Sequence, residues 1–223
     1  MEKEYVVKIL FIEFVTHNVK RFILEKPVNY SFINGQAVDI SINKEGFRDK
    51  KRPFSFTSQN SDLVLEFIIK IYKDHNGVTK ELDSLKLGDE LIIAEPFGDF
   101  AYKGNGVFIA GGTGITPFIG MFRILKDKNK IENNKLIFSN KEYRDIILER
   151  ELKDIFNDNL ILVLTQEKKK PYEYGKINEE FLKKHIKNFK DKFYICGPQG
   201  FVNGINEILA KLGSKTENIS FSF

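Results

Sequence analysis

A glycine-rich turn near the middle of the chain has the residue types that hold a pyrophosphate. Residues 111–117 read GGTGITP and come directly after the apolar residues 107–110. Glycines let the backbone approach a phosphate without Cβ clashes, and the start of a helix offers free N–H groups and partial positive charge. The alternative is a tight strand-to-helix turn without a ligand, since Pro117 replaces the third glycine of G-x-G-x-x-G. The candidate dinucleotide-binding residues are Gly112, Thr113, Gly114 and Thr116.

A second group of candidates lies in residues 52–58, which read RPFSFTS. The Arg52 cation could pair with a phosphate, the Phe54 ring could cover a planar ring, and the Ser55 hydroxyl could bond a ring nitrogen. Pro53 lies between the first two. The alternative is an amphipathic strand whose polar residues face solvent.

Two further segments have chemistry of their own. Residues 76–79 read NGVT, and a turn that presents N–H groups and a hydroxyl can hold phosphate; an ordinary hairpin turn is the alternative. Residues 196–198 read CGP at the end of a predicted strand, where ligands of parallel sheets bind. A lone cysteine is otherwise a buried small apolar residue. The candidates are Gly77, Val78, Thr79, Cys196, Gly197 and Pro198.

The elements that must position these residues fall into two halves. The first hundred residues contain six stretches rich in Val, Ile and Phe separated by turn residues, which predicts a six-stranded antiparallel β-barrel. The strands are expected at residues 5–14, 20–25, 36–42, 52–57, 63–72 and 89–94.

After residue 106, short apolar strands alternate with helical spacing, which predicts a parallel five-stranded α/β sheet. We therefore expect two domains, residues 1–103 and 104–223. Strands are expected at residues 107–110, 135–139, 160–164, 192–196 and 218–222, and helices at 117–125, 145–156, 178–186 and 201–212.

Composition excludes several classes of protein. A net charge of +4 is too small to indicate nucleic-acid binding, and the single cysteine cannot build a disulfide framework or a cysteine-held cluster. The three histidines show no metal-ligand spacing, so no metal site is expected. No apolar run is long enough to span a membrane, and a cytoplasmic protein, most simply a monomer, is expected.

Taken in order, the four segments resemble those of the ferredoxin–NADP reductase superfamily, especially small bacterial flavodoxin or ferredoxin reductases. The resemblance extends from the F-x-x-G-Q segment at residues 32–36 to Phe201. The family's flavin motif is R-x-Y-S-x-x-S, and this chain has Phe54 at the tyrosine position, which keeps the ring and loses the hydroxyl. The GGTGITP and CGP nicotinamide motifs are intact.

The resemblance implies a barrel that binds flavin and an α/β domain that binds NAD(P), with hydride passing from nicotinamide C4 to flavin N5. It implies that Arg52 contacts the flavin phosphates, that Phe54 stacks on the isoalloxazine, and that Ser55 lies near N5. It places Cys196 near the nicotinamide, which makes Ser55 and Cys196 the candidate catalytic residues. Pro53, Lys70, Gly77, Val78, Thr79 and Phe223 complete the flavin set, and Gly112, Thr113, Gly114, Thr116, Gly197 and Pro198 form the nucleotide set.

The residues after the second strand of the α/β half bear on the choice of nucleotide. An NAD site of the ordinary type has an acid there, whereas this chain has Ser139 and Asn140, with Arg144 close by. A hydroxyl and a cation suit a 2′-phosphate, so NADPH is expected over NADH, although Glu142 and Asp145 lie nearby. FAD is preferred over FMN by the resemblance alone.

The predicted activity is that of an oxidoreductase that takes hydride from NAD(P)H onto FAD and passes electrons to a flavodoxin or ferredoxin. Lysine-rich stretches could attract such an acidic carrier. The open alternatives are the reductase component of an oxygenase, a free-flavin or ferric reductase, and a non-catalytic flavin-binding electron-transfer subunit.

Overall fold

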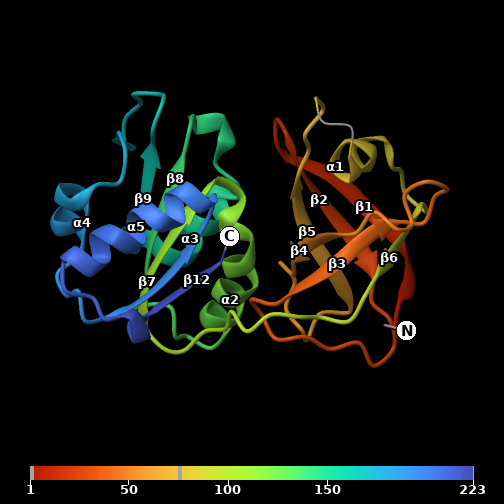
Figure 1. Cartoon of the computed structure of the whole chain (residues 1–223), viewed down its shortest axis with the longest axis horizontal. Coiled ribbons are helices and arrows are strands. Elements are labelled where there is room, and N and C mark those ends of the chain that lie inside the picture. Colours follow the sequence, from red (N-terminus) through yellow and green to blue (C-terminus); the bar gives the residue numbers. More distant parts are fainter. Residues whose placement is uncertain (1–2, 75–76, 223) are drawn as a thin grey trace. The chain divides into compact units, whose positions relative to one another are not determined.

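The computed structural model describes residues 3–74 and 77–222, which form two compact units (Figure 1). The first unit extends to Tyr102 and also includes Thr116–Met121. The second comprises Lys103–Ile115 and the residues from Phe122 onward. His75, Asn76 and Phe223, three residues considered in the sequence, lie outside the described residues.

The first unit is built on a six-stranded antiparallel sheet with the order β4-β3-β6-β1-β2-β5. A backbone hydrogen bond of 2.9 Å from Thr57, just after β4, to the carbonyl of Glu66 on β5 joins the two end strands of that order. The strands are β1 Tyr5–Thr16, β2 Val19–Glu25, β3 Ala37–Ile42, β4 Arg52–Ser55, β5 Val64–Lys70 and β6 Glu90–Ile93.

Alternating apolar side chains point inward and form the core of this unit. On β5, Leu65, Phe67 and Ile69 are almost completely buried, as expected for one face of a pleated strand. Phe56, which follows β4, is fully buried and stacks on Phe32 with 3.9 Å between ring centroids. The residues after β4 are therefore fixed by the core, which positions the strand itself.

The second unit is a parallel sheet flanked by helices. Its strand order is β10-β9-β8-β7-β11-β12, and every neighbouring pair is parallel. The strands are β7 Gly106–Gly111, β8 Lys135–Asn140, β9 Leu160–Leu164, β10 Glu173–Tyr174, β11 Lys192–Cys196 and β12 Ile219–Ser222.

Helices cover both faces of this sheet because its strands have apolar side chains on both sides. Leu182 of α4 and Val202 of α5 belong to one buried cluster with Ile109. On the other face, Phe122 of α2 packs edge-on against Phe108 and against Phe156 of α3. The helices are α2 Thr116–Asp127, α3 Glu149–Phe156, α4 Glu179–His185 and α5 Gln199–Lys211.

The predicted fold class is confirmed, with differences in detail. The parallel sheet has six strands where five were expected, because β10 consists of two residues that pair with β9. Helix α3 begins at Glu149, four residues later than expected, since Leu148 adopts a left-handed conformation with φ of 53°. A short helix, α1 Val78–Glu81, was not predicted. Among the described residues, no helix is long and apolar enough to cross a membrane.

Candidate functional site

Strand β4 displays the candidate residues of segment 52–58 along an edge of the core. Its partner is β3, with Arg52 opposite Ile40 and Phe54 opposite Val38. Phe54 is half-buried and packs against the apolar core, whereas Arg52 is exposed. Arg52 donates to the Lys51 carbonyl at 2.8 Å, and in the described part of the chain it pairs with no carboxylate. Its charge is therefore available to an anionic ligand.

A buried polar network holds the end of this strand in place. The Thr57 hydroxyl donates to Glu66 Oε1 at 2.8 Å, and the Ser58 hydroxyl accepts from the Glu66 backbone N–H at 3.0 Å. Glu66 is only 8% exposed, and the Arg21 guanidinium lies 3.7 Å from its other oxygen. Glu66 was not among the predicted site residues. An acid within the otherwise apolar residues 64–69 is the sequence signal that could have indicated its role.

The third group of candidates begins a short helix. Gly77 is extended, with φ of −153°, and caps α1, so the described residues of this segment lead into a helix. Val78 is buried and offers only its backbone, while Thr79 is half-exposed. Lys70, at the end of β5, places its ammonium 5.4 Å from the centre of the Tyr72 ring. No hydrogen bond or ion pair joins Lys70 or Thr79 to Arg52 within residues 3–74 and 77–222.

The nucleotide candidates meet at the point where the strand order of the parallel sheet reverses. From β7 the chain proceeds outward through β8 and β9, then returns to the other side of β7 as β11. The turn after β7 and the turn after β11 therefore lie side by side at the carboxyl ends of adjacent strands, with Ala110 opposite Cys196. Ligands of open α/β sheets bind at such switch points.

Backbone contacts at this point are so close that only glycine fits. A Cβ added to Gly114 would lie 2.3 Å from the Cys196 carbonyl oxygen and 2.5 Å from the Gly197 nitrogen. A Cβ on Gly197 would lie 2.8 Å from the Phe201 ring. Gly112 has φ of +55°, which also favours glycine. The two turns therefore form a surface of backbone without side chains between them.

A 3-10 helix, Gly112–Ile115, and helix α5 both begin at this surface, which concentrates N–H groups and partial positive charge there. Helix α2 continues from the 3-10 helix, with Thr116 as its first residue. Pro198 caps α5, and its carbonyl accepts from the Phe201 backbone N–H at 2.8 Å. Because Pro198 has no N–H and fixes its own φ, it starts the helix directly after the turn. An anionic group is stabilised between two helix starts of this kind.

Cys196 is a buried thiol rather than a reactive one. The side chain is 6% exposed. Burial raises the pKa of the thiol to about 12, and a hydrogen bond from the Gly197 backbone opposes this only in part. The thiolate is the nucleophilic form, so Cys196 is neutral at physiological pH and acts here by packing.

A mainly apolar cavity of about 380 Å³ adjoins this surface at the ends of β8 and β9. Ser139, Thr165 and Lys176 supply its polar groups, and Phe201 and Ile205 of α5 supply apolar ones. Cavities of this size with a few polar groups are typical of small-molecule sites. Ser139 was predicted from the sequence as a site residue, and Phe201 was not. Phe201 is the first residue of a predicted helix, and its ring lies against Gly111 and Gly197.

Asn140 and Arg144 differ from the expectation for a 2′-phosphate site. Asn140 is 5% exposed, and neither polar atom of its side chain has a hydrogen-bond partner. The Arg144 guanidinium is 2.8 Å from the Glu142 carboxylate. Glu142 also accepts from the backbone of Asp145 in a reciprocal cap. The Glu142 carboxylate is thus paired with Arg144, the cation that was expected to hold the 2′-phosphate.

No group of three or more His, Cys, Asp or Glu side chains that could hold a metal ion occurs among the described residues.

Two family models match the two halves of the chain. The model of the oxidoreductase FAD-binding domain matches residues 7–102, and that of the oxidoreductase NAD-binding domain matches residues 108–207.

The chain is similar to curated proteins from eukaryotes. It is 30% identical over 200 residues to NADH-cytochrome b5 reductase 2 of Mycosarcoma maydis, which covers 82% of this chain and 56% of that protein. It is 27% identical over 236 residues to NADH-cytochrome b5 reductase 3 of Rattus norvegicus, which covers 87% of this chain and 78% of that protein. The chain therefore spans little more than half the length of the first relative.

Solved structures share the fold over the whole chain. A ferredoxin NADP+ reductase from Neisseria gonorrhoeae with bound FAD and NADP superposes with a TM-score of 0.86 at 20% identity, covering 100% of this chain and 99% of that one. The FAD/NAD-binding domain of a Vibrio cholerae nitric oxide dioxygenase gives a TM-score of 0.87, also at 20% identity, and covers 100% of this chain and 98% of that one.

Proposed function

The chain belongs to the ferredoxin–NADP reductase superfamily of FAD- and NAD-binding oxidoreductases, and we propose that it transfers hydride from NADH to FAD and then electrons to a carrier protein. Residues 1–103 are proposed as the flavin-binding domain and residues 104–223 as the nucleotide-binding domain. Bound FAD would supply the hydride acceptor and the ability to release electrons one at a time. The protein's own residues bind and orient the two cofactors.

The observation that carries the proposal is the contact of Gly114 with the Cys196–Gly197 peptide at the switch point. Because no side chain intervenes, a pyrophosphate can reach the backbone N–H groups at the starts of the 3-10 helix Gly112–Ile115 and of α5. We assign the pyrophosphate to Gly112, Thr113, Gly114 and Thr116. The adenosine fits the cavity beside Ser139, and the nicotinamide is assigned to Cys196, Gly197 and Pro198.

Strand β4 fits the flavin. An exposed arginine without a carboxylate partner suits the flavin phosphates, and the half-buried Phe54 offers an apolar surface for the isoalloxazine. Ser55 is assigned to flavin N5 as a hydroxyl partner. Lys70 and the backbone and hydroxyl of residues 77–79 are assigned to the phosphates. Pro53 and Phe223 keep the roles expected from the sequence.

We propose NADH as the donor, in place of the NADPH expected from the sequence. The Arg144 charge is already balanced by Glu142, so a 2′-phosphate there would have to displace a carboxylate. The names of the curated relatives also specify NADH. The ratio of kcat/KM for the two nucleotides tests this choice, and a value that favours NADPH would overturn it.

The proposed acceptor is a separate one-electron carrier protein. Flavodoxin or ferredoxin is the electron acceptor expected from the sequence, whereas the names of the relatives point to cytochrome b5. Initial rates with purified ferredoxin, flavodoxin and cytochrome b5 would be compared with those for free FMN and a ferric chelate. We expect a carrier protein to be reduced most efficiently; higher kcat/KM with free flavin or ferric iron would identify a free-flavin or ferric reductase instead.

The cofactor assignment is tested by purification and reconstitution. We expect the protein to retain FAD, identified by mass spectrometry after denaturation, and to hold it in a stoichiometric complex. A protein that remains without flavin after incubation with excess FAD and FMN would refute the proposal. If FAD is bound but neither NADH nor NADPH reduces it, the chain is a non-catalytic flavin-binding subunit.

A further inference from the structure

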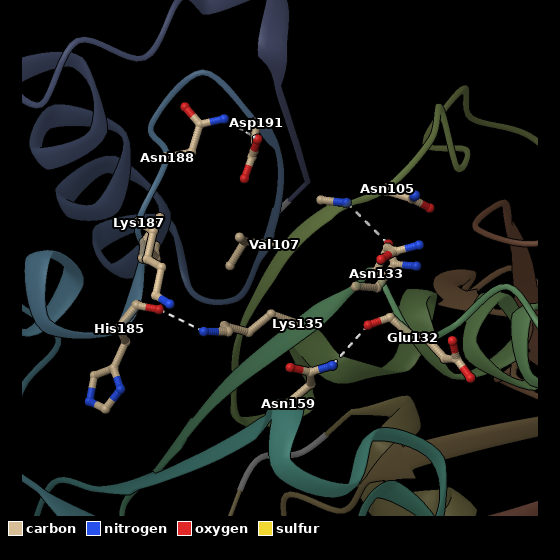
Figure 2. Close-up of a pocket in the computed structure, with 13 residues that line it drawn as sticks. Asn105, Val107, Glu132, Asn133, Lys135, Asn159, His185, Lys187, Asn188 and Asp191 are labelled. Atoms are coloured by element: carbon tan, nitrogen blue, oxygen red, sulfur yellow. Dashed lines mark hydrogen bonds between the residues drawn. The ribbon is translucent and has the colours of Figure 1, made fainter.

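A second cavity, of about 320 Å³, lies at the amino-terminal ends of strands β7, β8 and β9 (Figure 2). The nucleotide candidates follow the carboxyl ends of the strands, so this cavity is at the opposite edge of the same sheet. Its lining comes from the residues just before and at the start of those strands and from residues 185–191, which end α4 and lead to β11. Most of the lining side chains are amides or charged groups.

Two lysines from different elements converge in this cavity. Lys135 of β8 donates to the carbonyl oxygen of His185 at 2.7 Å (Figure 2). Lys187, on the segment after α4, lines the same cavity. Within the described residues, neither ammonium has a carboxylate in ion-pair range. Burial, and then the charge of Lys187, lower the pKa of Lys135. Among the described residues, the cavity therefore holds two like charges that form no ion pair.

The other charged groups of the cavity are engaged or turned to solvent. Asp191 accepts from the Asn188 side chain at 2.6 Å. Glu132 is exposed, and its backbone carbonyl accepts from Asn159 at 2.9 Å. The His185 ring lies beside Glu173, with 3.4 Å between Nε2 and Oε1. Burial lowers the pKa of the imidazole, and the charge of Lys135 is near enough to lower it further. Among the described residues, neither Glu132 nor Asp191 forms an ion pair with Lys135 or Lys187.

We propose that this cavity binds the phosphate group of a small phosphorylated molecule between Lys135 and Lys187. An anion there would offset the cost of two neighbouring unpaired cations, one of them partly buried. Lysine ammonium groups bind phosphate as point charges. Since a cavity of this size exceeds the volume of a phosphate ion, the amide side chains around it, such as Asn133 and Asn159, would contact the rest of the ligand.

The test is to measure phosphate binding to the full, FAD-loaded chain by NMR of its backbone amides and by calorimetry. The probes are inorganic phosphate and glycerol 3-phosphate, with acetate as a monoanion for comparison. We expect saturable shifts at residues 133–135 and 185–188, with tighter binding of glycerol 3-phosphate than of inorganic phosphate. Equal affinity for these two would limit the site to free phosphate and overturn the inference of a larger ligand.

Substitutions test whether the two lysines are the groups that bind the phosphate. Lys135→Met and Lys187→Met should each weaken binding tenfold or more, and Lys135→Arg should retain it. Lys190→Met removes the same charge from the same segment outside the cavity and should leave affinity unchanged. Because Lys187 is exposed, its variant reports even if Lys135→Met fails to fold. Unchanged affinity in Lys187→Met, non-saturable binding, or full displacement of phosphate by NADH would refute the proposal.

A second readout does not depend on affinity. Acylation with acetic anhydride at mildly alkaline pH favours amines of lowered pKa, so Lys135 should be labelled faster than exposed lysines. Glycerol 3-phosphate should protect Lys135 and leave Lys190 labelled at the same rate. Absence of protection at a saturating ligand concentration would contradict the placement of phosphate at this lysine.

Discussion

The substitution Gly114→Ala tests the nucleotide site at its closest contact. The added carbon would lie 2.3 Å from the Cys196 carbonyl oxygen, whereas ordinary contacts begin at 3.4 Å. The atoms that block it are backbone, so the turns must separate by about 1 Å in a closely packed region. A misplacement of about 1 Å costs roughly 100-fold in a reaction between positioned groups.

We therefore expect kcat/KM for NADH to fall by about 100-fold, equivalent to about 2.7 kcal/mol of transition-state stabilisation. Overpacking should also lower the free energy of unfolding by about 1–3 kcal/mol. FAD content should not change. The assay is steady-state reduction of an artificial acceptor over a range of NADH concentrations, with urea unfolding measured on the same preparations.

Gly106→Ala is the matched control. Its Cβ would lie 2.2 Å from the Lys192 carbonyl oxygen, an equal clash at the other end of the same strand. It should destabilise the fold to a similar extent while kcat/KM for NADH in the folded protein stays within a few-fold of wild type. If Gly114→Ala retains wild-type kcat/KM, or if both variants lose it equally, the pyrophosphate does not bind where we place it.

Three further predictions concern single side chains. Arg52→Ala should weaken FAD binding by about 1.5–3 kcal/mol, the range for a charge-assisted hydrogen bond, with a fluorescence titration as the measurement; undiminished affinity would contradict the phosphate contact. Glu66→Ala should leave the buried Thr57 hydroxyl without its side-chain acceptor and lower the free energy of unfolding by about 1–3 kcal/mol. Urea unfolding that gives the wild-type free energy would disprove this role. The pKa of the Cys196 thiol is raised from 9.0 to about 12 in the folded state, so its contribution to stability should be complete below pH 9 and be lost as pH rises toward 12. Iodoacetamide at pH 8 should label Cys196 far more slowly in the folded protein than in an unfolded control. Equal labelling rates would show an accessible thiol.

Much of the fold follows from local patterns in the sequence. Residues 160–164 and 192–196 are predicted strands that form with the same bounds, because continuous apolar runs between turn residues indicate buried parallel strands. Strand β10 could not be predicted, since two residues carry no periodicity and pair only because β9 presents an edge. The start of α3 depends on the left-handed Leu148, which no helix-start signal in the sequence marks.

The candidate site is less accessible to sequence reasoning because it depends on long-range contacts. The two glycine turns could be recognised separately, yet their close approach, which would place a Cβ on Gly114 2.3 Å from the Cys196 carbonyl oxygen, comes from strand order alone. Glu66 lies within a predicted strand, and its role as the acceptor that fixes Thr57 depends on a contact with another strand. The NADPH expectation rested on Ser139 and Asn140 in place of an acid and on the charge of Arg144, and the sequence places Glu142 nearby without showing that it pairs with Arg144.

The most direct test of the central claim is anaerobic mixing of the FAD-loaded protein with NADH in a stopped-flow spectrometer. We predict that the visible flavin absorbance is lost in a single fast phase, that deuterium at the transferred C4 position slows this phase, and that Gly114→Ala slows it further. A flavin that stays oxidised, or a reduction rate unaffected by both deuterium and Gly114→Ala, would contradict direct hydride transfer from a nucleotide bound at the switch point.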